Sequence, residues 1–262
     1  MTLRVATYNV NSVRARLPIL LPWLERVRPD IVCLQETKAQ DPDFPLASFR
    51  DLGYEAAFRG EKSYNGVAIL STVKPTRVAF GLDDEGPADE ARLAAATIRG
   101  LRVVNTYVPQ GRATDDPMFA YKLEWLARLR TYFERLASER AGGGRVLWMG
   151  DLNVAPEPID VHDPKRLLGH VCFHPDVRRA LDEMRRLGFE DVFRRHVPGP
   201  GQYSFFDYRV KDAVGRNVGW RVDHIWASAP LARRSTAAWI DLEPRRAEGT
   251  SDHAPVVAEF DV

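Results

Sequence analysis

Short apolar segments with a strand-like pattern alternate with segments of helical periodicity along this chain. Leu3–Val10 alternates apolar and polar residues and predicts a strand, whereas apolar residues from Leu17 to Val27 recur at helical spacing before Pro29. Further strands are predicted at Ile31–Leu34, Gly66–Ser71, Arg102–Val108, Arg145–Met149, Trp220–Ala227 and Pro255–Phe260, and further helices from Phe119 to Leu136 and from Val177 to Leu187. This mixed order predicts an α/β protein, and because no linker interrupts it, we expect residues 1–262 to form a single domain.

Composition excludes several classes of protein. The 262 residues are 45% hydrophobic, which is enough for a substantial core, and no apolar run approaches the ~18 residues of a membrane-spanning helix. Net charge is +1, so any nucleic acid must bind a local basic face. Two cysteines exclude a disulfide framework, and the N-terminus passes directly into a strand pattern without a signal peptide. We therefore expect a cytoplasmic protein with no membrane partner.

Carboxylate and amide residues gather where the predicted strands end. They form five clusters: Asn9 with Asn11, Gln35-Glu36-Thr37, Asp151-Leu152-Asn153, Asp223-His224 and Ser251-Asp252-His253. A carboxylate next to an apolar strand is costly unless something pairs with it, and five such clusters could converge at one sheet edge. Oxygen ligands without thiolates suit a hard cation, so the pattern favours Mg²⁺ or Mn²⁺.

Each cluster taken alone also has an ordinary structural explanation. Asn9 and Asn11 could be turn residues, and Glu36 could cap a helix or lie on the surface. The Asp151-Leu152-Asn153 segment could be an Asx turn after a strand. The order of the clusters along the chain is far more specific than any one of them.

That order resembles the exonuclease III family of apurinic/apyrimidinic endonucleases, within the endonuclease/exonuclease/phosphatase superfamily. The motifs that carry the resemblance are Tyr8-Asn9-Val10-Asn11, Leu34-Gln35-Glu36-Thr37-Lys38, Tyr107-Val108-Pro109-Gln110-Gly111, Gly150-Asp151-Leu152-Asn153, Phe205-Phe206-Asp207-Tyr208-Arg209, Asn217-Val218-Gly219-Trp220-Arg221, Val222-Asp223 and Ser251-Asp252-His253-Ala254-Pro255. They span essentially the whole chain. The resemblance implies a four-layer α/β sandwich, in which two mixed β-sheets pack face to face and helices flank them.

The resemblance also implies a role for each polar strand-end residue. Glu36 would be the main metal ligand, with Asn9 and Asp252 close by. Asp151 and Asn153 would face both the cation and the scissile phosphate. Asp223 would orient His253, and the sequence leaves open whether Asp151 or His253 takes the proton from water. Tyr107 would donate to the phosphate or act as phenolate, although alone it could equally be a core aromatic.

Three further expectations concern substrate binding. The family often has Asp where this chain has Asn11, so a second metal is in doubt and Asn11 is expected to contact phosphate or water. Phe205, Trp220 and Val222 would form an apolar pocket that admits an abasic sugar and excludes a base, unless they are simply core residues. Arginines and lysines in loops near the motifs are candidates for phosphate contacts: Arg59, Lys62, Arg112, Lys165, Arg166, Arg209 and Arg221. Arg112 is the strongest of them.

The function implied is a monomeric, Mg²⁺- or Mn²⁺-dependent DNA repair nuclease. It would hydrolyse the phosphodiester 5′ to abasic sites and act as a 3′-to-5′ exonuclease and 3′-end-cleaning enzyme on double-stranded DNA. The balance of these activities would depend on loops near Arg112, His170 and Trp220. The alternatives are a phosphodiesterase of the same fold that acts on RNA or lipid and, least favoured because the acids and His253 are retained, a non-catalytic regulatory binding protein.

Overall fold

Two six-stranded β-sheets pack face to face at the centre of the protein, which a computed structural model describes at residues 2–84, 86 and 90–262. The first sheet has the order β11-β12-β1-β2-β4-β3, with β1 (Thr2–Asn9), β2 (Ile31–Gln35), β3 (Glu55–Arg59), β4 (Val67–Ser71), β11 (Ser235–Ile240) and β12 (Val256–Asp261). The second has the order β5-β6-β7-β8-β10-β9, with β5 (Thr76–Phe80), β6 (Leu93–Ile98), β7 (Leu101–Tyr107), β8 (Val146–Asp151), β9 (Phe189–Asp191) and β10 (Asp223–Ser228). Both sheets are mixed, because β1 runs parallel to β2 and β7 parallel to β8 while the other pairs are antiparallel.

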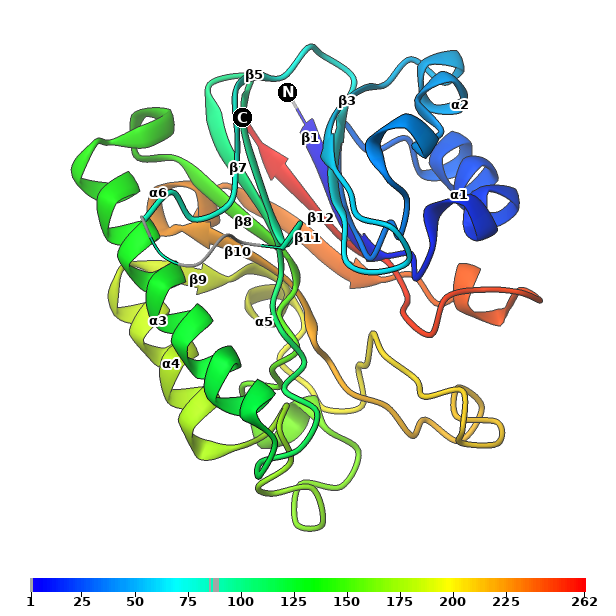
Figure 1. The fold of residues 1–262 in the computed structure, drawn as a ribbon, viewed down its shortest axis with the longest axis vertical. Helices are drawn as coiled ribbons and strands as arrows, with labels where there is room; N and C mark the ends of the chain where they lie inside the picture. The colour runs from blue at the N-terminus through cyan, green and yellow to red at the C-terminus, as the bar shows by residue number, and fades with distance from the viewer. Residues whose placement is uncertain (1, 85, 87–89) are drawn as a thin grey trace.

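Helices cover the two outer faces of this pair of sheets (Figure 1). On one side lie α1 (Val13–Val27) and α2 (Leu46–Asp51), and on the other lie α3 (Pro117–Ser138) and α4 (Pro175–Arg186). The short helices α5 (Val192–His196) and α6 (Ala229–Ala232) contribute apolar side chains to the core between the sheets. The predicted four-layer α/β sandwich is thereby confirmed.

Alternation of side chains along the strands explains the three apolar layers. Leu3 and Val5 of β1 face Leu147 and Met149 of β8 across the space between the sheets. The opposite faces pack against the helices, α1 and α2 in one cluster and α3 and α4 in the other. The central strands of both sheets are therefore buried on both faces, whereas the edge strands β3 and β5 are partly exposed.

The structure extends and corrects the predicted elements. β6 was not predicted because its sequence, Leu-Ala-Ala-Ala-Thr-Ile, is rich in alanine, which has low strand propensity but fits here between two buried faces. β3, β5, β9 and β11 and the short helices α2, α5 and α6 were not predicted either. The strand expected at 220–227 begins only at Asp223, and Trp220 takes part in isolated bridges with Val161 and Phe205.

The two chain ends and the long loops lie at opposite ends of the sandwich (Figure 1). β1 and β2 run in parallel from the end with the termini toward the end with the loops, so the residues that follow them emerge among those loops. In the part of the chain that the structure describes, no helix combines the length and apolarity needed to cross a membrane.

Candidate active site

The polar strand-end residues meet at the loop end of the space between the sheets. Strand pairing places Tyr107 opposite Asp151 on one side and Asp223 opposite Asp151 on the other. All three share the inward face of their strands with core residues such as Met149. They therefore cap the apolar core at the edge from which the loops emerge.

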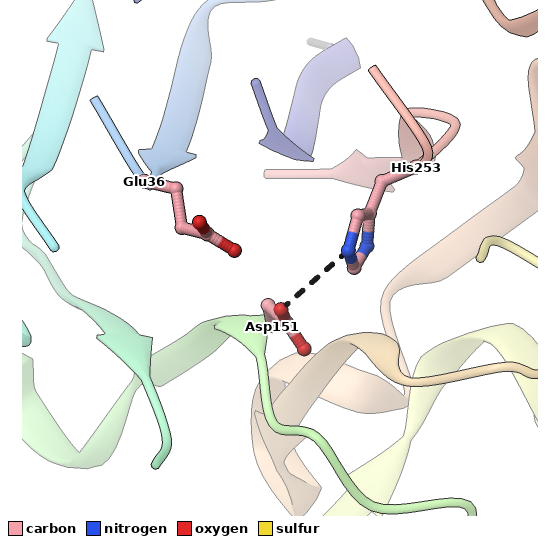
Figure 2. A group of neighbouring side chains, drawn as sticks. All are labelled: Glu36, Asp151 and His253. Carbon is pink, nitrogen blue, oxygen red and sulfur yellow. Dashed lines mark ion pairs between the residues drawn. The ribbon is translucent and has the colours of Figure 1, made fainter. Parts of the chain in front are cut away.

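Three side chains from both sheets form a group of donors that could hold a metal ion. Ligand atoms of Glu36, Asp151 and His253 all lie within 4.8 Å of one another. Figure 2 shows the three side chains pointing into one space, Glu36 from the end of β2 and Asp151 from the end of β8. His253 Nε2 lies 3.9 Å from Asp151 Oδ2.

Asn9 lies beneath this group and bridges its two acids. Its Nδ2 donates to Glu36 Oε1 at 2.8 Å and to Asp151 Oδ2 at 2.9 Å, while its Oδ1 accepts from the backbone N–H of Asn11. Asn9 thus joins the first sheet to the second through the two carboxylates. In this arrangement it presents its amide N–H groups to the acids, so it positions the ligands that surround it.

The local backbone aims these side chains by adopting left-handed conformations. Glu36 has a φ of 50° and Asn153 a φ of 48°, which are uncommon for residues other than glycine and tend to persist at functional sites. Gly150, just before Asp151, is required for another reason: a Cβ there would lie 1.9 Å from the carbonyl oxygen of Thr106. β8 can approach β7 this closely only with glycine at that position.

A hydrogen-bonded chain orients His253. Its Nδ1 donates to Asp223 Oδ2 at 2.8 Å, and the Ser204 hydroxyl donates to the same oxygen at 2.6 Å. The Ser204 oxygen also accepts from the backbone N–H of Asp223. This chain leaves His253 Nε2 directed toward the acids, as a carboxylate–histidine pair does when it fixes the orientation of an imidazole.

Burial and neighbouring charge shift the titration of the central groups in different directions. Burial raises the pKa of Asp151. Burial alone would lower the pKa of His253, but the charges of Asp223 and Asp151 raise it. Burial opposes ionisation of Glu36, yet the ammonium of Lys38, 2.8 Å away, lowers its pKa. The geometry therefore favours an imidazolium facing a carboxylate of raised basicity.

The acids open into a pocket of about 310 Å³ that also contains the predicted sugar-binding residues. Its lining consists of Glu36, Tyr107, Gln110, Asp151, Asn153, His170, Cys172, Phe205, Asp207, Arg209, Trp220, Val222, Asp252 and His253. The Phe205 ring lies 4.9 Å from the His253 ring, and the His170 ring lies 4.6 Å from the Trp220 ring. Burial raises the pKa of Tyr107 well above its ordinary value, and the charges of Glu36 and Asp151 add to this, so its hydroxyl is a proton donor. The structure thus places the three side chains that could hold a metal ion, Glu36, Asp151 and His253, beside an apolar wall of the pocket formed by Phe205, Trp220 and Val222.

Other predicted site residues lie outside this lining. Asn11 is held at both ends of its amide, since Nδ2 donates to Asp252 Oδ1 and Oδ1 accepts from Lys38 Nζ at 2.6 Å. The Arg112 side chain is 73% exposed on the turn after β7, with Asp116 at 3.9 Å. Asn11 is therefore a bridge beside the pocket, and Arg112 is free to reach a ligand at the rim.

The expectation that Arg221 faces DNA was wrong. Its guanidinium is fully buried, where Nε donates to Asp160 Oδ1 and Nη2 to Asp191 Oδ2, each at 2.7 Å. Its Nη1 donates to Nδ1 of His224 at 3.0 Å, and His224 Nε2 donates to the carbonyl of Val154. His224 points away from Asp223, as strand alternation predicted. The network lies behind the site and ties neighbouring loops to β10.

Sequence reasoning gave no role to several residues of the site, of which Lys122 and Ser204 are the most important. Lys122 is fully buried on α3 and contacts the loop of Asn153. A lysine three residues after Phe119 and four before Leu126, on the apolar face of a predicted helix, was the available signal. Ser204 carried no comparable signal, because its partner Asp223 follows 19 residues later.

The donor set fits a hard divalent cation. Glu36 and Asp151 offer carboxylate oxygens, and the group contains no thiolate, as Mg²⁺ and Mn²⁺ prefer. Asp252 lines the same pocket but hydrogen-bonds to Asn11 and stands outside the tight group. Glu36 and Asp151 are the residues placed to hold a cation directly.

Comparison with known proteins agrees with this geometry over the whole chain. The sequence profile of the Endonuclease/Exonuclease/phosphatase family matches residues 6–253. Exodeoxyribonuclease III of Haemophilus influenzae is 34% identical over 98% of this chain and all of that protein. An AP endonuclease from Archaeoglobus fulgidus superimposes with a TM-score of 0.95 at 52% identity, covering 99% of this chain and 100% of that chain. A 3′ phosphatase from Neisseria, solved with a product DNA hairpin, gives 0.93 at 38% identity with the same coverage. The chain therefore belongs to the endonuclease/exonuclease/phosphatase family and is one of its nucleases, as the strand-end motifs predicted.

Proposed function

We propose that this protein is a Mg²⁺- or Mn²⁺-dependent DNA repair nuclease that cleaves 5′ to abasic sites and trims 3′ ends of double-stranded DNA. The observation that carries the proposal is that Glu36, Asp151 and His253 open into the same pocket as Phe205 and Trp220. A phosphate held at the acids would place the neighbouring sugar against the two aromatic rings. The names of the relatives, an exodeoxyribonuclease III, an AP endonuclease and a 3′ phosphatase, cover the same three reactions.

Different residues of the chain would take different roles in the hydrolysis of the phosphodiester. A cation held by Glu36 and Asp151 would neutralise charge on the phosphoryl oxygens. Asp151, which would lie beside that cation, is placed to orient the attacking water and accept its proton. His253 is held protonated by Asp223 and donates from Nε2 to a phosphoryl oxygen. The Asn153 amide donates to Asp151 and to the Val108 carbonyl and so fixes Asp151, and Tyr107, kept neutral by its raised pKa, donates from its hydroxyl.

Selectivity for abasic sites would come from the apolar wall. Phe205, Trp220 and Val222 bound a pocket whose open volume of about 310 Å³ is shared with the acids, so a bare sugar fits more easily than a nucleotide with its base. The His170 ring, tilted by 45° against that of Trp220, lines the same space. Arg112 at the rim is available for a backbone phosphate of the duplex.

Further parts of the proposal concern the working form of the enzyme. We expect residues 1–262 to act as one domain, since both sheets contribute to a single cluster of polar groups, and we expect that domain to work as a monomer. Both cysteines are free thiols, which a reducing compartment such as the cytoplasm preserves.

The test is a product assay with Mg²⁺ on three labelled duplexes, one abasic, one with a blunt 3′-hydroxyl and one with a 3′-phosphate. We expect incision of the abasic strand and release of nucleotide or phosphate from the 3′ ends, and loss of all three activities in Asp151→Asn. RNA and a sphingomyelin or phosphoinositide vesicle serve as competing substrates. Turnover of RNA or lipid with no action on any duplex would contradict the proposal.

A further inference from the structure

The ammonium group of Lys122 is buried and bonded to three separate segments of the chain. Lys122 lies on α3 and is fully buried. Its Nζ donates to the carbonyl oxygens of Asn153 at 2.7 Å, Val171 at 2.8 Å and Gln110 at 3.2 Å. Its three N–H bonds match these three acceptors, so the group is saturated by backbone carbonyls alone.

Each of these segments contributes to the pocket wall. Gln110 and Asn153 line the pocket themselves, and Val171 lies between His170 and Cys172, which do so as well. The segments come from distant parts of the sequence, after β7, after β8 and before α4. They also touch pairwise, through Asn153 Nδ2 to the carbonyl of Val108 and Ala155 N–H to the carbonyl of Cys172. Lys122 contacts all three at one point.

Burial of a lysine at this position destabilises the fold unless its ammonium group makes compensating interactions. Methionine would fill a similar volume on the same helix face without the desolvation cost of burying a charge. The cost is offset only while all three carbonyls stay near one nitrogen, which strongly restricts the loops. Gly111, with a φ of +94°, brings the chain so close that a Cβ there would lie 3.2 Å from Lys122 Cδ.

We propose that Lys122 is a positioning residue of the nuclease site, which fixes the Gln110, Asn153 and Val171 loops relative to one another. Holding the carbonyl of Asn153 stabilises its left-handed backbone, and with it the amide that lies beside Asp151. Lys122 acts from behind the wall and does not reach the substrate. The proposal rests on the proposed nuclease function for its kinetic consequence, but the effect on the loops is independent of any substrate.

The kinetic experiment compares Lys122→Met with Leu129→Ala. Leu129 is a fully buried residue of the same helix and core cluster that has no part in the site. Activity on the abasic duplex is measured at saturating Mg²⁺ and well below the melting temperature of either variant. We expect Lys122→Met to lower kcat by ~10–100-fold with little change in KM, as a misplacement of catalytic groups does. Leu129→Ala should lower the melting temperature and leave kcat near that of the parent.

Amide hydrogen exchange supplies the readout that needs no substrate. In Lys122→Met, peptides that cover residues 108–112, 152–155 and 170–173 should exchange faster, while the sheets keep their protection. In Leu129→Ala the faster exchange should spread along α3 and into β7 and β8, which pack against it, whereas in Lys122→Met it should be confined to the three loop segments. If Lys122→Met does not fold, Lys122→Arg is measured instead. The planar, bulkier guanidinium cannot donate to all three carbonyls from the position of one nitrogen. The amides of the same three segments should therefore exchange faster.

Two results would overturn the proposal. One is Lys122→Met with parental kcat and fully protected loops. The other is a fall in kcat that follows the melting temperature equally in both variants, which would make Lys122 a packing residue only. A parent protein without activity on any duplex would refute the proposed function instead, and the exchange experiment would still decide the role of Lys122.

Discussion

Asp151 and His253 face each other in the site with opposite electrostatic surroundings. Asp151 is buried and shares Asn9 with Glu36, whereas His253 is bonded to Asp223 on the side away from the acids. The first is suited to accept a proton and the second to remain charged. In the proposed reaction, Asp151 would serve the attacking water while His253 serves the phosphoryl oxygens.

Replacement of these residues should separate their contributions to turnover. We expect Asp151→Asn and His253→Ala each to lower kcat by ~10²–10⁴-fold with the fold intact. Asp223→Asn should lower kcat less than His253→Ala, because His253 keeps a hydrogen-bond acceptor and loses only the neighbouring charge. Steady-state kinetics on the abasic duplex, with circular dichroism as the folding control, gives the comparison. A larger loss in Asp223→Asn would mean that the carboxylate has a contact of its own.

Trp220 tests the pocket wall without disturbing His253, which Phe205 contacts directly. Trp220→Ala should lower kcat/KM for the abasic duplex by ~10–100-fold, while cleavage beside an intact nucleotide falls less or rises, because a wider pocket discriminates less. The ratio of the two activities is the measurement. An equal loss of both, with a lower melting temperature, would make Trp220 a core residue.

Among the elements, β10 is fixed from two sides. Asp223 faces the space between the sheets and His224 faces the buried network of Arg221. Because Arg221 precedes the strand and bonds to Asp160 and Asp191, the network also holds the loop before α4 and the end of β9. The position of Asp223, which orients His253, thus depends on charges on the opposite face of its own strand.

The pH dependence of this network has a definite sign. Burial, assisted by the charge of Arg221, lowers the pKa of His224 from 6.5 to about 4. The unfolded chain therefore takes up a proton between these values that the folded protein does not, so stability present above pH 6.5 is lost as the pH falls toward 4. The loss from this one group is on the order of 3 kcal/mol. Burial opposes ionisation of Asp160, but the charges of Arg221 and Arg194 lower its pKa to about 2. Its contribution to the pH dependence of stability therefore lies at lower pH.

His224→Gln removes this titration and should change the slope of stability with pH. At neutral pH the variant should be less stable by about 1–3 kcal/mol, because the flexible Gln amide cannot reproduce the geometry with which the imidazole joins Arg221 to the Val154 carbonyl. The difference in free energy of unfolding between the variant and the parent should decrease as the pH falls from 6.5 toward 4. Urea unfolding of both proteins between pH 7 and pH 4.5 measures the difference, and parallel curves would show that His224 is not held neutral.

The sequence predicted the elements whose local pattern is strong and not those that depend on distant contacts. β1, β2, β8 and α3 follow from apolar periodicity, but the alanine-rich β6 is a strand only because two other layers bury it. The convergence of Glu36 and Asp151 was predictable from their positions at strand ends. The burial of Arg221 was not, since it depends on Asp160, 61 residues earlier. The bridge from Asn11 to Asp252 spans 241 residues and was equally hidden.

At the scale of the whole molecule, the metal group joins the two sheets. Glu36 follows β2 of the first sheet and Asp151 ends β8 of the second. A cation bound between them should stabilise the sandwich as a whole, in addition to its role in the reaction. Any ligand that binds only the folded state raises stability by mass action, by about 2.7 kcal/mol at 100 times its dissociation constant.

Addition of Mg²⁺ or Mn²⁺ should therefore raise the melting temperature by about 5–10 °C at saturation. Glu36→Gln should abolish most of that increase and raise the metal concentration needed for half-maximal cleavage. Differential scanning calorimetry against metal concentration, beside a chelator-treated sample, measures the first effect. An unchanged metal titration in Glu36→Gln would remove Glu36 from the ligand set, and full cleavage in excess chelator would refute the metal requirement.

β1 has β12 as one of its two neighbours, so the first strand of the chain pairs with the last. His253 lies just before β12, and Ser251 bonds to the carbonyl of Asn9 at the end of β1. A chain still emerging from the ribosome can fold much of the second sheet, but it lacks the imidazole and the partner of its first strand. Such an intermediate carries most of its acids and cannot complete the group that cuts DNA. A partly made chain that ends before Ser251 is therefore expected to contain Glu36 and Asp151 and yet to lack cleavage activity.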